Sequence, residues 1–341
     1  MAKKWFSFLW TAIILALLVY VLWGVNFYEV YDLIASANIL WFILAVVAMF
    51  FTYIVWNWRW QYIFRPVFRG DWGFMMHVLL AGSFFTTVTP GAGVGGEPFR
   101  AHFLSKKYNK PVSQVFGYVL GDKFFHLIVL GMFVIFSVFF ILIYVQISDA
   151  LTYILEAVLV IVVGLSTFVL YLVFKKSHFN IGAFLKRLHA FRFIKKYFKT
   201  AEEFEIYVNK RIKSFLTIFR KVLKNKNNLI VGLLLSILFW LLFYLSAYFL
   251  FLSFGKNMNF LSVIIVVTLG QIIGSLSAVP GGVGVVETSM TILYSAMGVT
   301  TSLALLVSFL FRIIQYFYSL FIGGMSLVHI RRKTNGRHGF F

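Results

Sequence analysis

Long apolar runs dominate the pattern of residues along this chain. A transmembrane helix needs about 20 mostly apolar residues to cross about 30 Å of hydrocarbon. Runs of this length cover residues 5–24, 38–58, 112–145, 150–174, 228–254 and 299–329. The pattern therefore predicts an all-α membrane protein with about six transmembrane helices.

Two further apolar stretches, 74–105 and 259–297, are interrupted in the middle by proline and glycine. Each half is shorter than a membrane span requires. We therefore expect two re-entrant helical hairpins that are broken at these positions. The alternative is a protein with eight transmembrane helices, in which broken half-helices form tilted spans.

The two interruptions carry the same motif. The first is Thr89-Pro90-Gly91-Ala92-Gly93-Val94-Gly95-Gly96-Glu97, and the second is Val279-Pro280-Gly281-Gly282-Val283-Gly284-Val285-Val286-Glu287. In both copies a glutamate follows the proline by seven positions. A helix that breaks at membrane depth exposes polar backbone groups, so it persists only where it is buried in protein or lines a wet cavity. Paired broken helices in matching halves indicate the midplane binding site of a transporter.

The basic residues predict the orientation, because Lys and Arg accumulate in cytoplasmic loops. The groups expected on the cytoplasmic side are Lys3 and Lys4; Arg59, Arg65 and Arg69; Lys106, Lys107 and Lys110; the segment 175–227; and Arg331, Arg332, Lys333 and Arg337. Both termini are then cytoplasmic, and the two broken stretches enter from opposite faces. The chain is thus a single polytopic membrane domain, 1–341, with an inverted repeat whose halves are 1–174 and 228–341.

The segment 175–227 joins the two halves and is strongly basic, with 15 Lys or Arg residues against three Glu. Apolar residues recur among the charges, as in an amphipathic interfacial helix. The simpler interpretation is that this linker lies on an anionic leaflet. A specific role in binding lipid headgroups or in regulation is the alternative.

The composition excludes several classes of protein. With 61% hydrophobic and only 12% charged residues, the chain lies far outside the soluble globular class. The absence of cysteine rules out disulfides and thiolate chemistry, and together with the lack of a targeting peptide it suits a prokaryotic plasma membrane. The basic residues that give the net charge of +20 cluster between the apolar spans, as juxtamembrane residues do. Nucleic acid is therefore not an expected partner.

Charged side chains inside apolar spans are costly and are candidates for function. Glu97 and Glu287 fall in the first turn after each break, where they act either as helix-start caps or in transport. The half-helix that begins near Gly95 and Gly96 directs its N–H groups at the break, which favours an anionic ligand such as a phosphate headgroup. The candidate substrate-binding or transport residues are Pro90, Gly91, Gly95, Gly96, Glu97, Arg100, Asp122, Lys123, His126, Pro280, Gly281, Gly282, Gly284, Glu287 and Arg312.

Two of these candidates carry further expectations. Arg312 lies in the middle of the last apolar run and requires a carboxylate partner, for which Glu287 or Glu97 would fit. This pair could also be a purely structural lock between helices. Asp122 and His126 are four residues apart and so share one helix face. No phosphate-binding loop, dinucleotide fingerprint, nucleophile elbow or metal-ligand spacing is found, so we expect no cofactor, no metal and no catalytic activity.

At these residues the chain resembles the transmembrane region of lysylphosphatidylglycerol synthases, a flippase-like family of bacterial and archaeal membrane proteins. The resemblance covers nearly the whole chain and rests on three blocks. They are Pro90-Gly91 through Glu97 and Arg100; Pro280-Gly281-Gly282-Val283-Gly284 through Glu287; and Arg312 with Tyr316-Phe317-Tyr318 and Gly323-Gly324. Two features depart from the family pattern: the first glycine-rich turn is two residues longer, and His126 stands where an aspartate is usual.

The resemblance implies that this chain corresponds to the part of the synthases that moves lipid between leaflets. In the synthases a separate soluble domain makes the aminoacyl lipid, and in other relatives a glycosyltransferase domain acts in polyprenyl-phosphate sugar assembly. We expect neither domain here, because the chain ends at Phe341 soon after the last apolar run.

Three functions are consistent with these features. The leading hypothesis is a flippase or transporter for a lipid or lipid-linked precursor, with an anionic phospholipid or polyprenyl-phosphate headgroup between the hairpins. The first alternative is a membrane enzyme that acts on a lipid phosphate with Asp122 and His126 as an acid–base pair. The second is a non-catalytic subunit that recruits a lipid- or glycan-modifying enzyme through 175–227. The sequence leaves the oligomeric state open, including a homodimer.

Overall fold

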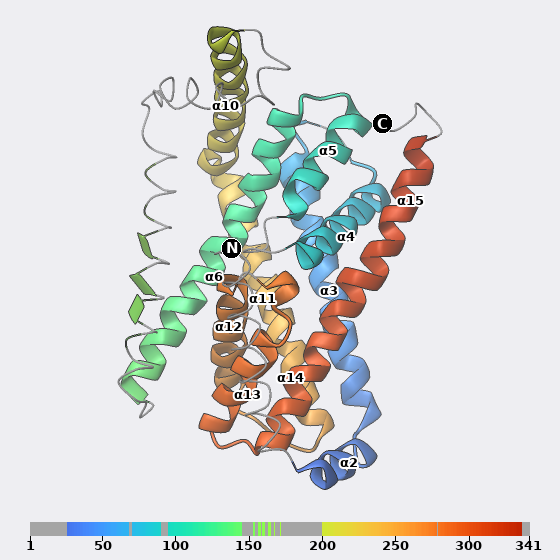
Figure 1. The fold of residues 1–341 in the computed structure, drawn as a ribbon, viewed down its shortest axis with the longest axis vertical. Helices are drawn as coiled ribbons and strands as arrows, with labels where there is room; N and C mark the ends of the chain where they lie inside the picture. Colours follow the sequence, from blue (N-terminus) through green and yellow to red (C-terminus); the bar gives the residue numbers. More distant parts are fainter. Residues whose placement is uncertain are drawn as a thin grey trace, which may run out of the picture.

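The computed structural model describes residues 26–67, 70–89, 95–144, 200–277 and 279–335, together with isolated positions between 153 and 171. All regular secondary structure in these ranges is helical, which confirms the predicted all-α class (Figure 1). The predicted span 5–24 lies outside the described residues. Of the predicted span 150–174, only isolated positions are described.

Within the described ranges, four helical segments are long and apolar enough to cross a membrane. They are α3 (Ile39–Phe64), α6 (Val112–Tyr144), α11 (Lys226–Ser253), and a last segment that is formed by α14 (Thr301–Tyr316), the π-helical η2 (Phe317–Ile322) and α15 (Gly323–Asn335). They coincide with the predicted runs 38–58, 112–145, 228–254 and 299–329. The chain is therefore an integral membrane protein with several candidate spans.

Shorter helices form two hairpins. The first consists of α4 (Trp72–Val88) and α5 (Gly96–Tyr108); the second consists of α12 (Phe260–Leu276), the 3₁₀ turn η1 (Pro280–Gly282) and α13 (Val285–Ala296). Even the longest of these helices has 17 residues and a length of about 25 Å, less than the hydrocarbon thickness of about 30 Å. The predicted interruption of both apolar stretches is confirmed.

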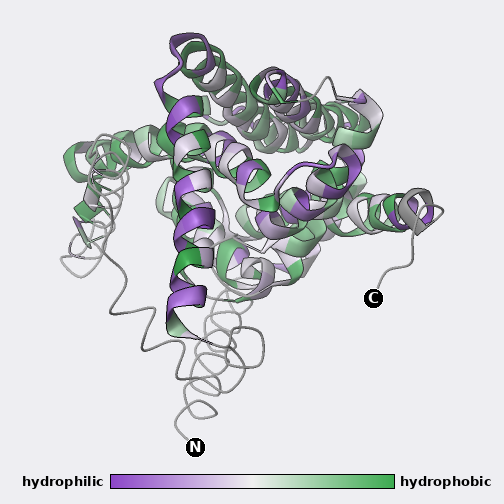
Figure 2. Ribbon diagram, turned by 90° about the horizontal axis from the view of Figure 1, so that it is seen from above, coloured by the Kyte–Doolittle hydropathy of each residue, from purple (hydrophilic) through white to green (hydrophobic). Residues whose placement is uncertain are grey.

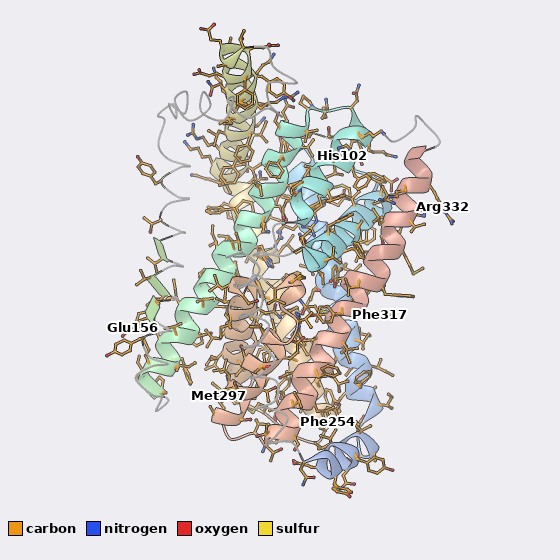
Figure 3. All side chains as sticks on the ribbon, viewed as in Figure 1. His102, Glu156, Phe254, Met297, Phe317 and Arg332 are labelled. Carbon is orange, nitrogen blue, oxygen red and sulfur yellow. The ribbon has the colours of Figure 1, made fainter. Side chains whose placement is uncertain are left out.

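The hairpins occupy opposite halves of the molecule (Figure 1). In Figure 3, His102 of α5 and Arg332 of α15 mark one end, while Phe254 and Met297 mark the other, and Phe317 lies between. The short helix α2 (Phe27–Ala35) lies at the end that Phe254 and Met297 mark. Each hairpin is flanked in sequence by two long helices, in the order α3, α4, α5, α6 and again α11, α12, α13, α14.

The turn of the second hairpin lies beside the end of α4 in the first hairpin. In the turn of the second hairpin, Gly281, Gly282 and Gly284 have φ angles of 62°, 66° and 78°. Side chains rarely tolerate this left-handed region, so the turn requires glycine. A Cβ atom added to Gly281 would lie 3.2 Å from both the Cγ2 atom and the carbonyl oxygen of Thr87, near the end of α4. The second turn therefore contacts the first hairpin directly.

Helix α10 (Ala201–Lys224) lies in the basic linker and is amphipathic. Its buried residues are Phe204, Phe219, Val222 and Leu223. The helix packs on α6, where Gly121 leaves room for Val222. Seen from the end that carries α10, the long helices are mainly hydrophobic, whereas hydrophilic residues are prominent along α10 (Figure 2). Residues 175–199 of the linker lie outside the described residues.

We expect the close packing within the first hairpin to be sensitive to a single methyl group at Gly96. An added Cβ would overlap the carbonyl oxygen of Gly82 and the hydroxyl of Thr86, so α5 would have to move away from α4. Overpacking of this kind costs about 1–3 kcal/mol. Gly96→Ala should therefore lower the midpoint of thermal unfolding in detergent. The matched control is Gly164→Ala, whose added methyl group meets nothing within 4 Å. Equal midpoints for the two variants would contradict this packing.

Candidate functional site

A buried ion pair joins α3 to α6. The Asp122 carboxylate accepts hydrogen bonds from the Nε and Nη2 atoms of Arg59, at 2.6 and 3.1 Å. The indole nitrogens of Trp56 and Trp60 donate to the same carboxylate, at 3.1 and 2.8 Å. The remaining guanidinium nitrogen of Arg59 donates to the hydroxyl of Ser236 on α11, at 2.6 Å. Both charges are thus buried and almost fully hydrogen-bonded.

The prediction that Arg59 lies outside the span is wrong. Helix α3 continues to Phe64, and the Arg59 side chain is completely buried. Arg65, by contrast, is exposed just past the end of α3.

A second charged cluster surrounds Glu97 at the start of α5. The Nζ atom of Lys123 donates to Glu97 Oε1 at 2.7 Å, and Arg100 Nη1 lies 3.5 Å from the same oxygen. Arg100 also donates to the hydroxyl of Ser83, and its guanidinium lies 4.5 Å from the ring centre of Trp56. Glu97 thus lies in the first turn of α5 and pairs with two cations from α5 and α6.

His126 is enclosed by aromatic rings. Its imidazole stacks on Trp240, with centroids 4.8 Å apart, and is nearly parallel to the ring of Trp56. Its buried Nδ1 atom has no hydrogen-bond partner in the described part of the chain. Among the same residues, no hydrogen bond joins His126 to Asp122, whose carboxylate is occupied by Arg59. The geometry gives no support to an acid–base pair of these two residues.

The third charged cluster lies in the other half of the molecule. Arg312 on α14 pairs with Glu287 on α13, with 3.0 Å between Nε and Oε1, which confirms the predicted carboxylate partner. Its other nitrogens donate to the side chain of Gln315, the carbonyl oxygen of Gly281 and the hydroxyl of Tyr316. Arg312 thereby holds the turn of the second hairpin.

Two cavities adjoin these clusters. The larger, of about 320 Å³, is lined by residues from both halves, including Glu97, Arg100, Lys123 and His126. The smaller, of about 150 Å³, lies beside Arg312 and the turn of the second hairpin. The two cavities share six lining residues, all with hydroxyl or amide side chains. These residues, which we call the polar collar, are Thr86, Thr87, Gln271, Ser275, Gln315 and Ser319.

The structure therefore brings most of the predicted site residues to one region. Gly96, Glu97, Arg100, Asp122, Lys123 and His126 lie at or beside the larger cavity, and Gly281, Gly282 and Arg312 line the smaller one; Pro280, Gly284 and Glu287 flank its turn, and Gly95 precedes α5. Pro90 and Gly91 lie outside the described residues.

Sequence reasoning missed Arg59 and the polar collar as parts of the site. For four collar residues the available signal was that hydroxyl and amide side chains precede each break, in pairs such as Gln271 and Ser275. Gln315 and Ser319 lie on the last apolar run. As for metals, within the described ranges no three His, Asp or Glu side chains are close enough to hold an ion together.

The larger cavity has an excess of positive charge. Three cations, Arg59, Arg100 and Lys123, face two carboxylates, Glu97 and Asp122, which leaves one positive charge. Glu97 Oε2 is buried and has no hydrogen-bond partner among the described residues. The cavity is thus suited to a ligand that carries a negative charge and also offers a hydrogen-bond donor.

Comparison with known proteins gives a consistent result over nearly the full chain. A family model described as the lysylphosphatidylglycerol synthase TM region matches residues 7–323. The chain is 26% identical over 327 residues to a UPF0104 membrane protein of Pyrococcus horikoshii, covering 93% of this chain and 95% of that protein. It is 28% identical over 292 residues to a UPF0104 membrane protein of Methanothermobacter thermautotrophicus, and the match covers 84% of this chain and 85% of that protein.

Proposed function

Because the chain belongs to the lysylphosphatidylglycerol synthase TM region family, we propose that it is a lipid transporter of the flippase type. Its substrate is a lipid with an anionic headgroup, either a phospholipid or a polyprenyl-phosphate-linked precursor. The headgroup passes through the two cavities while the chains stay in the bilayer, and the protein catalyses no chemical reaction.

The observation that carries this proposal is the pair of neighbouring cavities that share the polar collar. A charged headgroup cannot cross hydrocarbon unless polar groups replace its water. The larger cavity offers one net positive charge, the polar collar offers hydroxyl and amide groups, and the smaller cavity offers Arg312. These groups lie where the two broken hairpins meet, as expected for a transporter whose site lies between repeats.

The proposal includes a membrane topology. The two hairpins are re-entrant, enter from opposite faces and are related by an inverted repeat. The end that carries α10 and Arg332 is cytoplasmic, since basic residues accumulate on that side of a membrane. Acidic Glu29 and Asp32 of α2 lie at the opposite end, in keeping with this orientation. Both termini are cytoplasmic, and the membrane is the plasma membrane of a prokaryote.

Without a nucleotide-binding motif, transport runs downhill or uses an ion gradient. If protons supply the gradient, Glu97 and Glu287 are the residues that carry them, because each is a buried carboxylate in the first turn after a break.

Lipid translocation in proteoliposomes tests this function. Labelled phosphatidylglycerol, phosphatidylcholine and a polyprenyl-phosphate lipid are offered in parallel, and movement between leaflets is followed by dithionite reduction of the outer-leaflet label. We expect the wild type to move an anionic lipid faster than phosphatidylcholine. Glu97→Gln should reduce that rate at least tenfold, since it removes a charge that balances Lys123 and Arg100.

The matched control is Glu202→Gln, which removes one carboxylate from the exposed first turn of α10. It should translocate at the wild-type rate. A wild type that moves none of the three lipids would contradict the proposal. So would a folded Glu97→Gln variant with an unchanged rate.

A further inference from the structure

A groove of about 890 Å³ lies on the surface of the molecule beside the ends of α3 and α11. It is lined by Trp58, Gln61, Tyr62, Arg65, Gly70, Trp72, Val231 and Leu235. None of these residues lines the central cavities, so the groove is separate from the proposed transport path.

One end of the groove is polar. Arg65 is exposed, and its guanidinium lies 5.1 Å from the ring centre of Tyr62. The amide nitrogen of Gln61 is buried and has no hydrogen-bond partner within the described part of the chain. Arg65 is the one charged side chain among the described residues that line the groove. This end therefore offers an exposed cation to an anion.

The other end of the groove is apolar. Trp58 lies two turns before Arg65, about 10 Å deeper along α3, and is 54% exposed. Leu235 lies one turn deeper than Val231 along α11. The indole of Trp72, 42% exposed, borders the groove near its polar end, as tryptophan commonly does at the membrane interface. The lining of the groove thus changes from cationic near the end of α3 to apolar deeper along the helix. The change takes place over a distance comparable to the depth of a lipid's glycerol region.

We propose that this groove is a binding site for a resident anionic phospholipid. Its phosphate accepts hydrogen bonds from Arg65, and one of its chains lies against Trp58 and Leu235. A resident lipid differs from a transported one because it stays bound on the outer surface of the protein. Arg65, the one charged side chain among the described lining residues, favours a phospholipid of net negative charge over a zwitterionic one.

Native mass spectrometry of the detergent-purified protein tests this site by titration with phosphatidylglycerol or phosphatidylcholine. We expect a saturable phosphatidylglycerol site that Arg65→Gln weakens about tenfold, the loss of one charge-assisted hydrogen bond, whether or not a second lipid binds in the central cavities. Trp58→Ala should weaken it as well, since it shortens the apolar wall. Because only binding is measured, this result does not depend on whether the protein transports lipid.

The matched control is Lys213→Gln, which removes one exposed positive charge from α10, outside the groove. It should leave the affinity unchanged. Equal weakening by Arg65→Gln and Lys213→Gln would overturn the proposal in favour of general attraction to an anionic surface. Displacement of the lipid by inorganic phosphate alone would show a free-anion site. A dimer that Arg65→Gln dissociates would assign the groove to a second copy of the chain.

Discussion

Arg312→Ala is expected to slow lipid translocation by about 30- to 150-fold, the equivalent of 2–3 kcal/mol for a lost charge-assisted interaction. Arg312 is the one cation that lines the smaller cavity among the described residues. Without it, an anionic headgroup that leaves the polar collar meets no positive charge on that side. The initial rate in proteoliposomes, normalised to folded protein, measures the effect.

Arg312 also holds the second hairpin, so its loss could act through the fold alone. The double variant Arg312→Ala/Glu287→Ala separates the two roles, because it leaves no uncompensated carboxylate. We expect this variant to fold and yet remain as slow as the single variant, whereas Arg312→Lys should keep part of the rate. Wild-type translocation by the neutral double variant would show that the pair is only a structural lock.

Asp122→Ala is expected to lower the free energy of unfolding by about 3–5 kcal/mol, the usual cost of breaking a buried ion pair from one side. The substitution leaves Arg59 buried, with two of its nitrogens deprived of their acceptor, and also removes the acceptor of Trp56 and Trp60. The unfolding temperature in detergent, monitored by gel filtration, measures the loss of stability.

Asp32→Ala is the control for this variant, because Asp32 is exposed on α2. It should unfold within a few degrees of the wild type. Adding Arg59→Met to Asp122→Ala should restore part of the lost stability, since it removes the unpaired charge. If Asp122→Ala and Asp32→Ala unfold at the same temperature, the ion pair between α3 and α6 contributes little to stability.

The broken hairpins could be predicted from sequence because proline and glycine act locally. A proline cannot continue the hydrogen bonding of a helix, and the glycines admit the backbone angles of the turn that follows. The partner of Arg312 could be narrowed to two residues for a similar reason. A lone guanidinium deep in an apolar run is too costly, and the chain has few intramembrane carboxylates.

Arg59 and the polar collar could not be predicted in this way, because their roles depend on contacts between distant segments. At the end of an apolar run, Arg59 resembles an ordinary flanking charge, and its partner Asp122 lies 63 residues away. The hydroxyls of Thr86 and Thr87 bond to carbonyl oxygens one turn earlier in their own helix. Such residues are ordinary in membrane helices, and only the packing of the two halves brings them together.

The pairing of Arg59 with Asp122 has a consequence for how the chain enters the membrane during synthesis. The arginine emerges first, and its carboxylate follows only after the whole first hairpin has been made. Until then α3 carries an uncompensated charge, which disfavours its release into lipid. We therefore expect α3 to remain at the insertion machinery until α6 arrives, so that α3 to α6 enter the bilayer as one unit.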